Sequence, residues 1–272
     1  MARTRRIKKD GDGHYHVMSR TNGKAFLFKS GRFKTRMVEL LKISAEFSGV
    51  RLLGYSILTN HFHALVDVVK PDEPLPEKEI LRRIAVLKGN RYADMEEERW
   101  SKLRHDGQVA VIEVELEKWR RRMHDVSEFV KTYKELVSIA FKRETEHCGS
   151  IWSGRFTSTL VEGGRYLAVC RRYIELNPVR AGLARQSAHY EWCSAGDASF
   201  SASTAGSVPE WEGRMMARVV QIGAGKIFGS REFVEAELMR EATRGLSPRA
   251  QARGVYAEAY ASHGWKLAAK AA

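Results

Sequence analysis

The sequence has few cysteines and no long apolar run. Its three cysteines, Cys148, Cys170 and Cys193, are widely separated, which excludes an even disulfide framework and a paired zinc-ligand motif. We expect them to be buried, reduced thiols. No apolar stretch approaches the roughly 18 residues that a membrane-spanning helix needs, and the basic start has no apolar segment behind it. We therefore expect no membrane association and a cytoplasmic location.

Positive charge is in excess over the whole chain. The 46 Lys and Arg residues outnumber 33 Asp and Glu, which gives a net charge of +13 and a pI near 9.7. Such a balance attracts polyanions, either nucleic acid or, as the weaker alternative, an anionic membrane surface. The apolar content of 43% is typical of a folded protein, and 272 residues can bury a core without a structural metal.

Strand and helix patterns alternate along the first two thirds of the chain. They predict, in order, a strand over 14–19, a helix over 32–47 stopped by Gly49, a hairpin of strands over 51–58 and 61–69, a helix from 77, a helix over 126–147, a strand over 155–161 and a helix over 165–176. One antiparallel hairpin within this order is consistent with an α+β fold of the split βαβ sandwich type.

Three further segments do not belong to this pattern. The stretch 94–125 is so rich in alternating charge that we expect a solvent-facing insertion within a domain spanning 1–195. Ser, Ala, Gly and Thr dominate 196–209, which predicts a linker. We expect a helical extension over 210–272, with Ser230 as a helix cap.

His61 and His63 are two residues apart in a predicted strand. Their side chains therefore leave the same face of the sheet, and neutral imidazoles so placed can hold one metal ion. The alternative is an incidental pair with ordinary hydrogen-bond partners.

Tyr173 and Asn177 are one helical turn apart, so their side chains can point at the same place. A tyrosine is a possible nucleophile when a cation lies nearby, because its unperturbed pKa is roughly 10. The alternative is a core tyrosine on an apolar stripe.

Four motifs resemble the REP-associated tyrosine transposases. They are Tyr15-His-Val-Met-Ser-Arg, Gly54-Tyr-Ser-Ile-Leu-Thr-Asn-His-Phe-His-Ala-Leu-Val, Gly154-Arg-Phe and Arg172-Tyr-Ile-Glu-Leu-Asn-Pro-Val-Arg-Ala-Gly. The resemblance runs from about residue 13 to residue 195. It implies an HUH nuclease with a ferredoxin-like, antiparallel split βαβ fold.

The resemblance also implies roles for individual residues. His61 and His63 stand at the two-histidine metal motif, Asn177 at the place of a third metal ligand, and Tyr173 at the nucleophile. In this family the tyrosine takes the 5′ phosphate of a cut strand and leaves a free 3′ hydroxyl. The implied substrate is single-stranded DNA beside a palindromic hairpin, and the oligomeric state is open between monomer and homodimer.

Other residues are assigned by their chemistry and position. Two imidazoles and an amide oxygen leave positions for phosphate oxygens and water, which favours Mg²⁺ or Mn²⁺ over a structural zinc. Asp67, on the same strand face, is an alternative third ligand or a solvent-facing residue. Trp152 and Phe156 either stack an unpaired base or pack in the core. Five arginines are expected to hold DNA phosphates or to be solvated: Arg155, Arg165, Arg171, Arg172 and Arg180.

Two other function classes share some of these features. A non-catalytic relative that binds hairpin DNA would keep the charge and the fold, but it has no use for His61, His63 and Tyr173 together. A two-histidine phosphoesterase would need a second His-x-Ser or His-x-Thr motif, which the sequence lacks. Catalysis on single-stranded DNA is therefore the leading interpretation.

Overall fold

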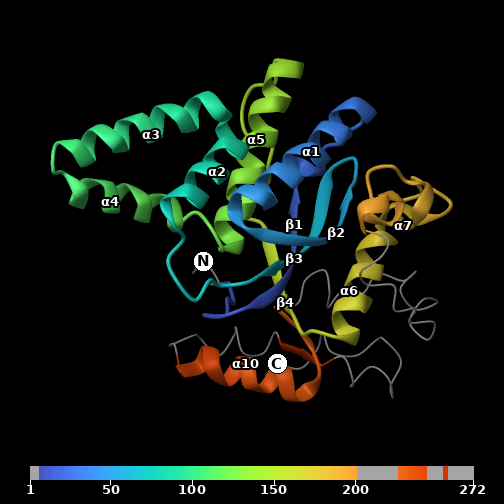
Figure 1. Ribbon diagram of the computed structural model, residues 1–272. Coiled ribbons are helices and arrows are strands. Elements are labelled where there is room, and N and C mark those ends of the chain that lie inside the picture. Colours follow the sequence, from blue (N-terminus) through green and yellow to red (C-terminus); the bar gives the residue numbers. More distant parts are fainter. Residues whose placement is uncertain (1–5, 201–225, 244–253, 257–272) are drawn as a thin grey trace.

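A six-stranded sheet forms the centre of the computed structural model, which describes residues 6–200, 226–243 and 254–256 (Figure 1). The order across the sheet is β2-β3-β1-β4-β5-β6. The strands are β1 (Gly13–Arg20), β2 (Val50–Ile57), β3 (His61–Val68), β4 (Thr157–Val161), β5 (Ile227–Gly229) and β6 (Gly254–Tyr256). The first four pair antiparallel, whereas β5 and β6 each run parallel to the preceding strand. The predicted mixed α+β class is confirmed.

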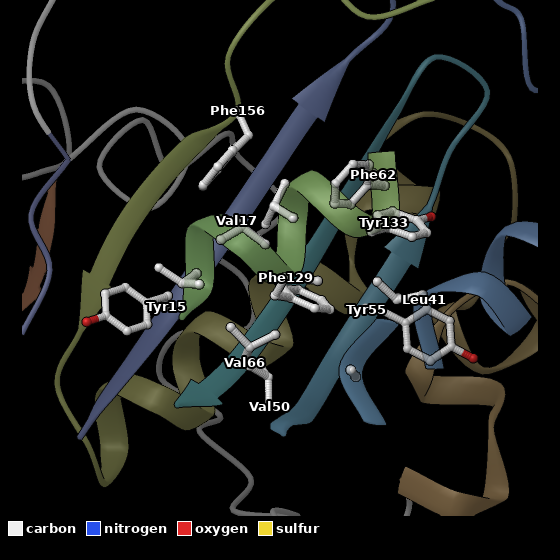
Figure 2. Packing of buried hydrophobic residues seen from close by; sticks show 14 of the residues in the cluster. Tyr15, Val17, Leu41, Val50, Tyr55, Phe62, Val66, Phe129, Tyr133 and Phe156 are labelled. Carbon is white, nitrogen blue, oxygen red and sulfur yellow. The ribbon is translucent and has the colours of Figure 1, made fainter. Parts of the chain in front are cut away.

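Two long helices cover one face of the sheet. These are α1 (Gly31–Ser48) and α5 (Val126–Thr145), and both bury apolar stripes against alternate strand residues. Figure 2 shows this packing, with Phe129 and Tyr133 of α5 lying over Val17 and Phe62 of the strands. As predicted, Gly49 ends α1, because it takes the left-handed conformation (φ 63°) that glycine adopts without strain.

The opposite face of the sheet is covered by α6 (Arg165–Glu175), which is followed by the one-turn helix α7 (Asn177–Arg180). Alternation along β3 sends Phe62 to the α5 side and His63 and Leu65 to the α6 side. A second apolar cluster lies on this face, and it includes four residues of α6: Tyr166, Val169, Cys170 and Tyr173. One face of the sheet therefore packs against α1 and α5, and the other carries His63 on the side of α6.

The charged insertion predicted over 94–125 is helical. It takes in most of α3 (Asn90–His105) and all of α4 (Val109–Arg120), which follow α2 (Glu77–Lys88) and project from the body of the molecule (Figure 1). The expectation that most of it faces water is confirmed, because most residues of 94–125 are exposed. The helices share a buried apolar cluster with the end of α1: Phe47, Ile80, Ile84, Ala93, Trp100, Ile112, Leu116 and Met123.

The predicted linker and extension need correction. Residues up to Phe200 pack on the domain, since Asp197 accepts hydrogen bonds from the Tyr55 hydroxyl at 2.9 Å and from Lys42 Nζ at 2.7 Å. The rest of the predicted linker, 201–209, lies outside the described residues. The extension is not purely helical, because it adds β5 and β6 to the sheet beside its helix α10 (Arg231–Thr243). Ser230 does cap that helix, accepting from Phe233 N at 3.2 Å.

The cysteines are free, as expected, but only Cys170 and Cys193 are buried, whereas Cys148 is exposed. Among the described helices, none is long and apolar enough to cross a membrane.

Candidate active site

The two histidines of β3 lie side by side on the face covered by α6. The ring centroids of His61 and His63 are 5.1 Å apart. Nδ1 of His61 donates to the Asn60 side-chain oxygen at 2.6 Å, which leaves its lone pair on Nε2. The strand therefore presents the pair as its alternation predicts.

His16 of β1 is a third histidine at this place, and the sequence reasoning missed it. Its Nε2 lies 2.8 Å from Nδ1 of His63, and the two rings stack with centroids 5.0 Å apart. Both side chains are buried. The signal in the sequence is strand alternation, which puts His16 on the opposite face of the strand from its neighbour Tyr15.

Positive charge surrounds this histidine group. Burial lowers the pKa of His63 well below its ordinary value, and repulsion from His16, His61, Arg180 and Arg20 adds to the effect. His63 is therefore a neutral imidazole at pH 7. Arg20, which pairs with His61 across the sheet, buries its Nε without a hydrogen-bond partner. These charges suit an anionic substrate.

Tyr173 reaches the histidines from α6. Its ring centroid lies 6.2 Å from that of His16 and 6.4 Å from that of His63, and the residue is only 3% exposed. The Arg180 guanidinium lies 4.1 Å from the centre of the Tyr173 ring and donates to the Tyr173 carbonyl at 2.7 Å. The structure thus brings a phenol, three imidazoles and an arginine together.

Asn177 begins α7, directly below Tyr173. Its side-chain nitrogen donates to the carbonyls of Tyr173 and Ile174, both at 3.2 Å. The amide oxygen is therefore the atom that remains as a possible metal ligand. Asn177 is 9% exposed, so the surrounding packing holds the amide in this orientation.

The five arginines are not gathered in one place. Arg180 lies over the Tyr173 ring. Arg171 is buried in an ion pair with Glu175 at 2.8 Å and also donates to the Phe200 carbonyl, so it serves packing rather than DNA contact. Arg172 donates to the Ser187 hydroxyl at 3.1 Å.

The remaining two arginines differ from each other in position. Arg165, at the start of α6, donates to the Tyr166 hydroxyl at 2.9 Å. Arg155 lines a cavity with Ser127 at the start of α5, on the other side of the sheet from Tyr173. Arg155 therefore does not lie beside Tyr173, although the two are close in sequence.

The structure also places the three residues for which the sequence left two interpretations open: Trp152, Phe156 and Asp67. Trp152 and Phe156 are buried in the core that α1 and α5 cover, which is the packing alternative. Asp67 is neither a ligand beside the histidines nor a solvent-facing residue. It is 4% exposed and pairs with Arg51 at 2.5 Å and His14 at 3.6 Å.

The donor set decides which metal these residues could hold. Among the described residues, no three His, Cys, Asp or Glu side chains are arranged to hold a metal ion. Nδ1 of His61 and of His63 is engaged by a neighbour, so Nε2 is the ring nitrogen of each that could take a metal ion. The Asn177 amide oxygen, at the start of α7, is the third candidate ligand.

Comparisons with known proteins give a distant likeness among solved structures. No protein-family model and no curated protein matches the chain. Among solved structures, it is similar to a REP-associated tyrosine transposase bound to a REP hairpin, with a TM-score of 0.44 and 13% sequence identity. The match covers 71% of this chain and 82% of that one.

Proposed function

We propose that the chain is a metal-dependent endonuclease that cuts single-stranded DNA through a covalent bond between Tyr173 and a 5′ phosphate. The observation that carries this proposal is the convergence of Tyr173 with His61, His63 and His16 from separate elements. Tyr173 packs in the apolar cluster under α6, but its ring also lies edge-on to two imidazoles and beside the Arg180 guanidinium. The experiment that tests it is the search for a protein-DNA adduct, described in the Discussion.

The order of elements supports the fold that the motifs imply. Along the chain β1, α1, β2, β3, α5 and β4 follow one another, and the strands stand in the order 4-1-3-2 with both helices on one face. This order supports the ferredoxin-like split βαβ arrangement that we propose for the core. We propose that it is the HUH nuclease core, enlarged by the α3 and α4 insertion.

The reaction needs a nucleophile, a stabilised phosphate and a leaving group. The Tyr173 oxygen attacks phosphorus, the bond from phosphorus to the 3′ oxygen breaks, the phenol gives up its proton, and the 3′ oxygen takes one up. The Arg180 guanidinium, over the Tyr173 ring, puts a positive charge beside the place where the phosphate develops negative charge. Since Tyr173 is buried, a DNA strand reaches it only when the side chains that cover it move aside.

A bound divalent ion would polarise the phosphate under attack. His61, His63 and the Asn177 oxygen would hold it. Imidazole ligands suit softer ions than Mg²⁺, which prefers carboxylates, and Asp67 is committed to Arg51 and His14. Of the two expected ions, we therefore favour Mn²⁺.

His16 is proposed as a positioning residue for His63. Replacing His16 with alanine should lower the affinity for Mn²⁺ by roughly 10- to 100-fold, because metal-ligating histidines depend on the partner of their other nitrogen. Titration of the protein with Mn²⁺, followed calorimetrically, measures this directly. His16→Gln should restore part of the affinity. His14→Gln, on the same strand face but paired with Asp67, is the control and should bind the metal normally. Equal affinities in His16→Ala and wild type would refute the role.

The form of the substrate gives a separate prediction. A hairpin with a single-stranded flank should bind at least about tenfold more tightly than the same sequence as a perfect duplex, because splayed bases and hairpin shape are what single-strand readers recognise. Fluorescence anisotropy at one stated salt concentration measures both affinities. Equal affinity would favour a duplex-binding protein.

A further inference from the structure

A cationic hollow lies on the side of the sheet opposite Tyr173. A cavity of about 840 Å³ runs along α5 to the segment before β4 and adjoins a second cavity of about 440 Å³. Arg6, Ser127 and Arg155 line both. The larger volume falls within the range of ordinary ligand pockets.

Three cations of this hollow have no carboxylate partner in the described parts of the chain. Lys8 and Lys131 pair with Asp125 and Glu128, respectively, so their charge is largely compensated. Arg6, Lys134 and Arg155 form no such pair. Arg6 also buries its Nε without a hydrogen-bond partner, and a buried donor left unpaired is costly.

These three side chains lie close enough to repel one another. Burial and then the charge of Arg155 lower the pKa of Arg6 to about 10. Burial and then the charge of Arg6 lower the pKa of Lys134 to about 8. Lys134 Nζ donates to the carbonyl of Gly154, the residue before Arg155, at 2.6 Å. A bound anion would relieve the repulsion among these cations.

The wall of the hollow explains why the cations stay in place. The Arg6 guanidinium stacks on the Phe156 ring, 3.6 Å from its centre, and Lys134 Nζ lies 5.3 Å from the centre of the Trp152 ring. Both rings are buried in the core and cannot move away easily. Ile139 adds an exposed apolar patch to the same wall.

We propose that Arg6, Lys134 and Arg155 form a binding site for one backbone phosphate of the nucleic-acid substrate, on the face of the sheet remote from the cleavage site. This site depends on the proposed function only for the identity of the polyanion. It holds the DNA outside the catalytic centre, so that a strand bound at Tyr173 continues around the edge of the sheet to α5.

The experiment measures binding of a labelled hairpin with a single-stranded flank to the full chain over a range of salt concentrations. Arg155→Gln should weaken binding roughly tenfold and reduce the slope of log affinity against log salt by about one. Arg155→Lys should keep the slope, because it keeps the charge. The matched control is Arg121→Gln, which removes an exposed arginine of the α4 end that pairs with Glu117.

A second arm separates a DNA phosphate from a free one. Melting temperatures are measured with inorganic phosphate in the absence of DNA, for wild type and Arg155→Gln. If phosphate stabilises only the wild type while both proteins bind DNA alike, the site takes free phosphate and the proposal fails. It also fails if Arg155→Gln and Arg121→Gln show the same slope, or if the wild type does not bind the hairpin. This experiment measures binding and not cleavage, so it is independent of the proposed nuclease activity. If Arg155→Gln reduces the slope of log affinity against log salt but the wild type forms no covalent adduct with DNA, the nuclease proposal is refuted and the phosphate site is retained.

Discussion

Replacing Tyr173 with phenylalanine is expected to abolish the covalent protein-DNA adduct, with a loss of several orders of magnitude in cleavage, because the attacking oxygen is removed. The fold should survive, since the ring stays and the free energy of unfolding should change by about 1 kcal/mol or less. A denaturing gel of protein incubated with labelled single-stranded hairpin DNA and Mn²⁺ shows the adduct directly.

Tyr166 provides the matched control for this substitution. It lies on the same helix and is also buried, but its hydroxyl accepts from Arg165 and its ring packs edge-on against Phe228, away from the histidines. Tyr166→Phe should therefore form the adduct. An adduct that persists in Tyr173→Phe and disappears in Tyr166→Phe would assign the nucleophile to Tyr166, and absence from all variants would end the covalent mechanism.

Replacing either His61 or His63 with alanine is expected to reduce cleavage at least about a hundredfold while changing DNA affinity only a few-fold. Each substitution removes a proposed metal ligand, whereas contacts of Arg and Lys with phosphates supply most of the affinity. Cleavage rates and anisotropy on the same preparations separate the two effects. His105→Ala, an exposed histidine of α3, should behave as wild type.

Chelation gives an independent check of the same claim. EDTA should stop cleavage without a large change in melting temperature, because the sheet and its two apolar cores do not depend on a metal. Full activity in both histidine variants would contradict the metal site. A large fall in melting temperature on chelation would indicate a structural metal instead.

The sequence predicted the parts of the site that follow from local periodicity. Alternation along a strand placed His61 and His63 on one face, and the helical repeat placed Asn177 one turn from Tyr173. Both relations hold in the structure because each involves residues of one element or of adjoining elements. Gly49 as a helix stop and Ser230 as a cap are local signals of the same kind.

Residues from different elements were harder to predict. The place of His16 beside His63 depends on the register between β1 and β3, and a shift of one residue would turn it to the other face. Arg171 and Arg180 are both close to Tyr173 in sequence, yet one pairs with Glu175 and the other lies over the tyrosine ring. The packing around α6 and α7 decides which arginine pairs with Glu175 and which lies over Tyr173.

The segments after α6 and α7 were harder still to predict. β5 is only three residues long, and it forms because its backbone pairs with β4, more than sixty residues earlier in the chain. No alternation can be recognised over so short a stretch. Similarly, Arg155 comes shortly before β4 and lies with residues of α5, on the opposite side of the sheet from Tyr173. This separation could not be predicted before the arrangement of the sheet was known.

Identification of the DNA-linked peptide most directly tests whether Tyr173 forms the covalent bond to a 5′ phosphate. Wild-type protein is incubated with a single-stranded hairpin substrate and Mn²⁺, digested with a protease and a nuclease, and analysed by tandem mass spectrometry. The account predicts a nucleotide attached through its 5′ phosphate to the oxygen of Tyr173. A nucleotide attached to any other residue, or cleaved DNA with no linked peptide, would contradict it.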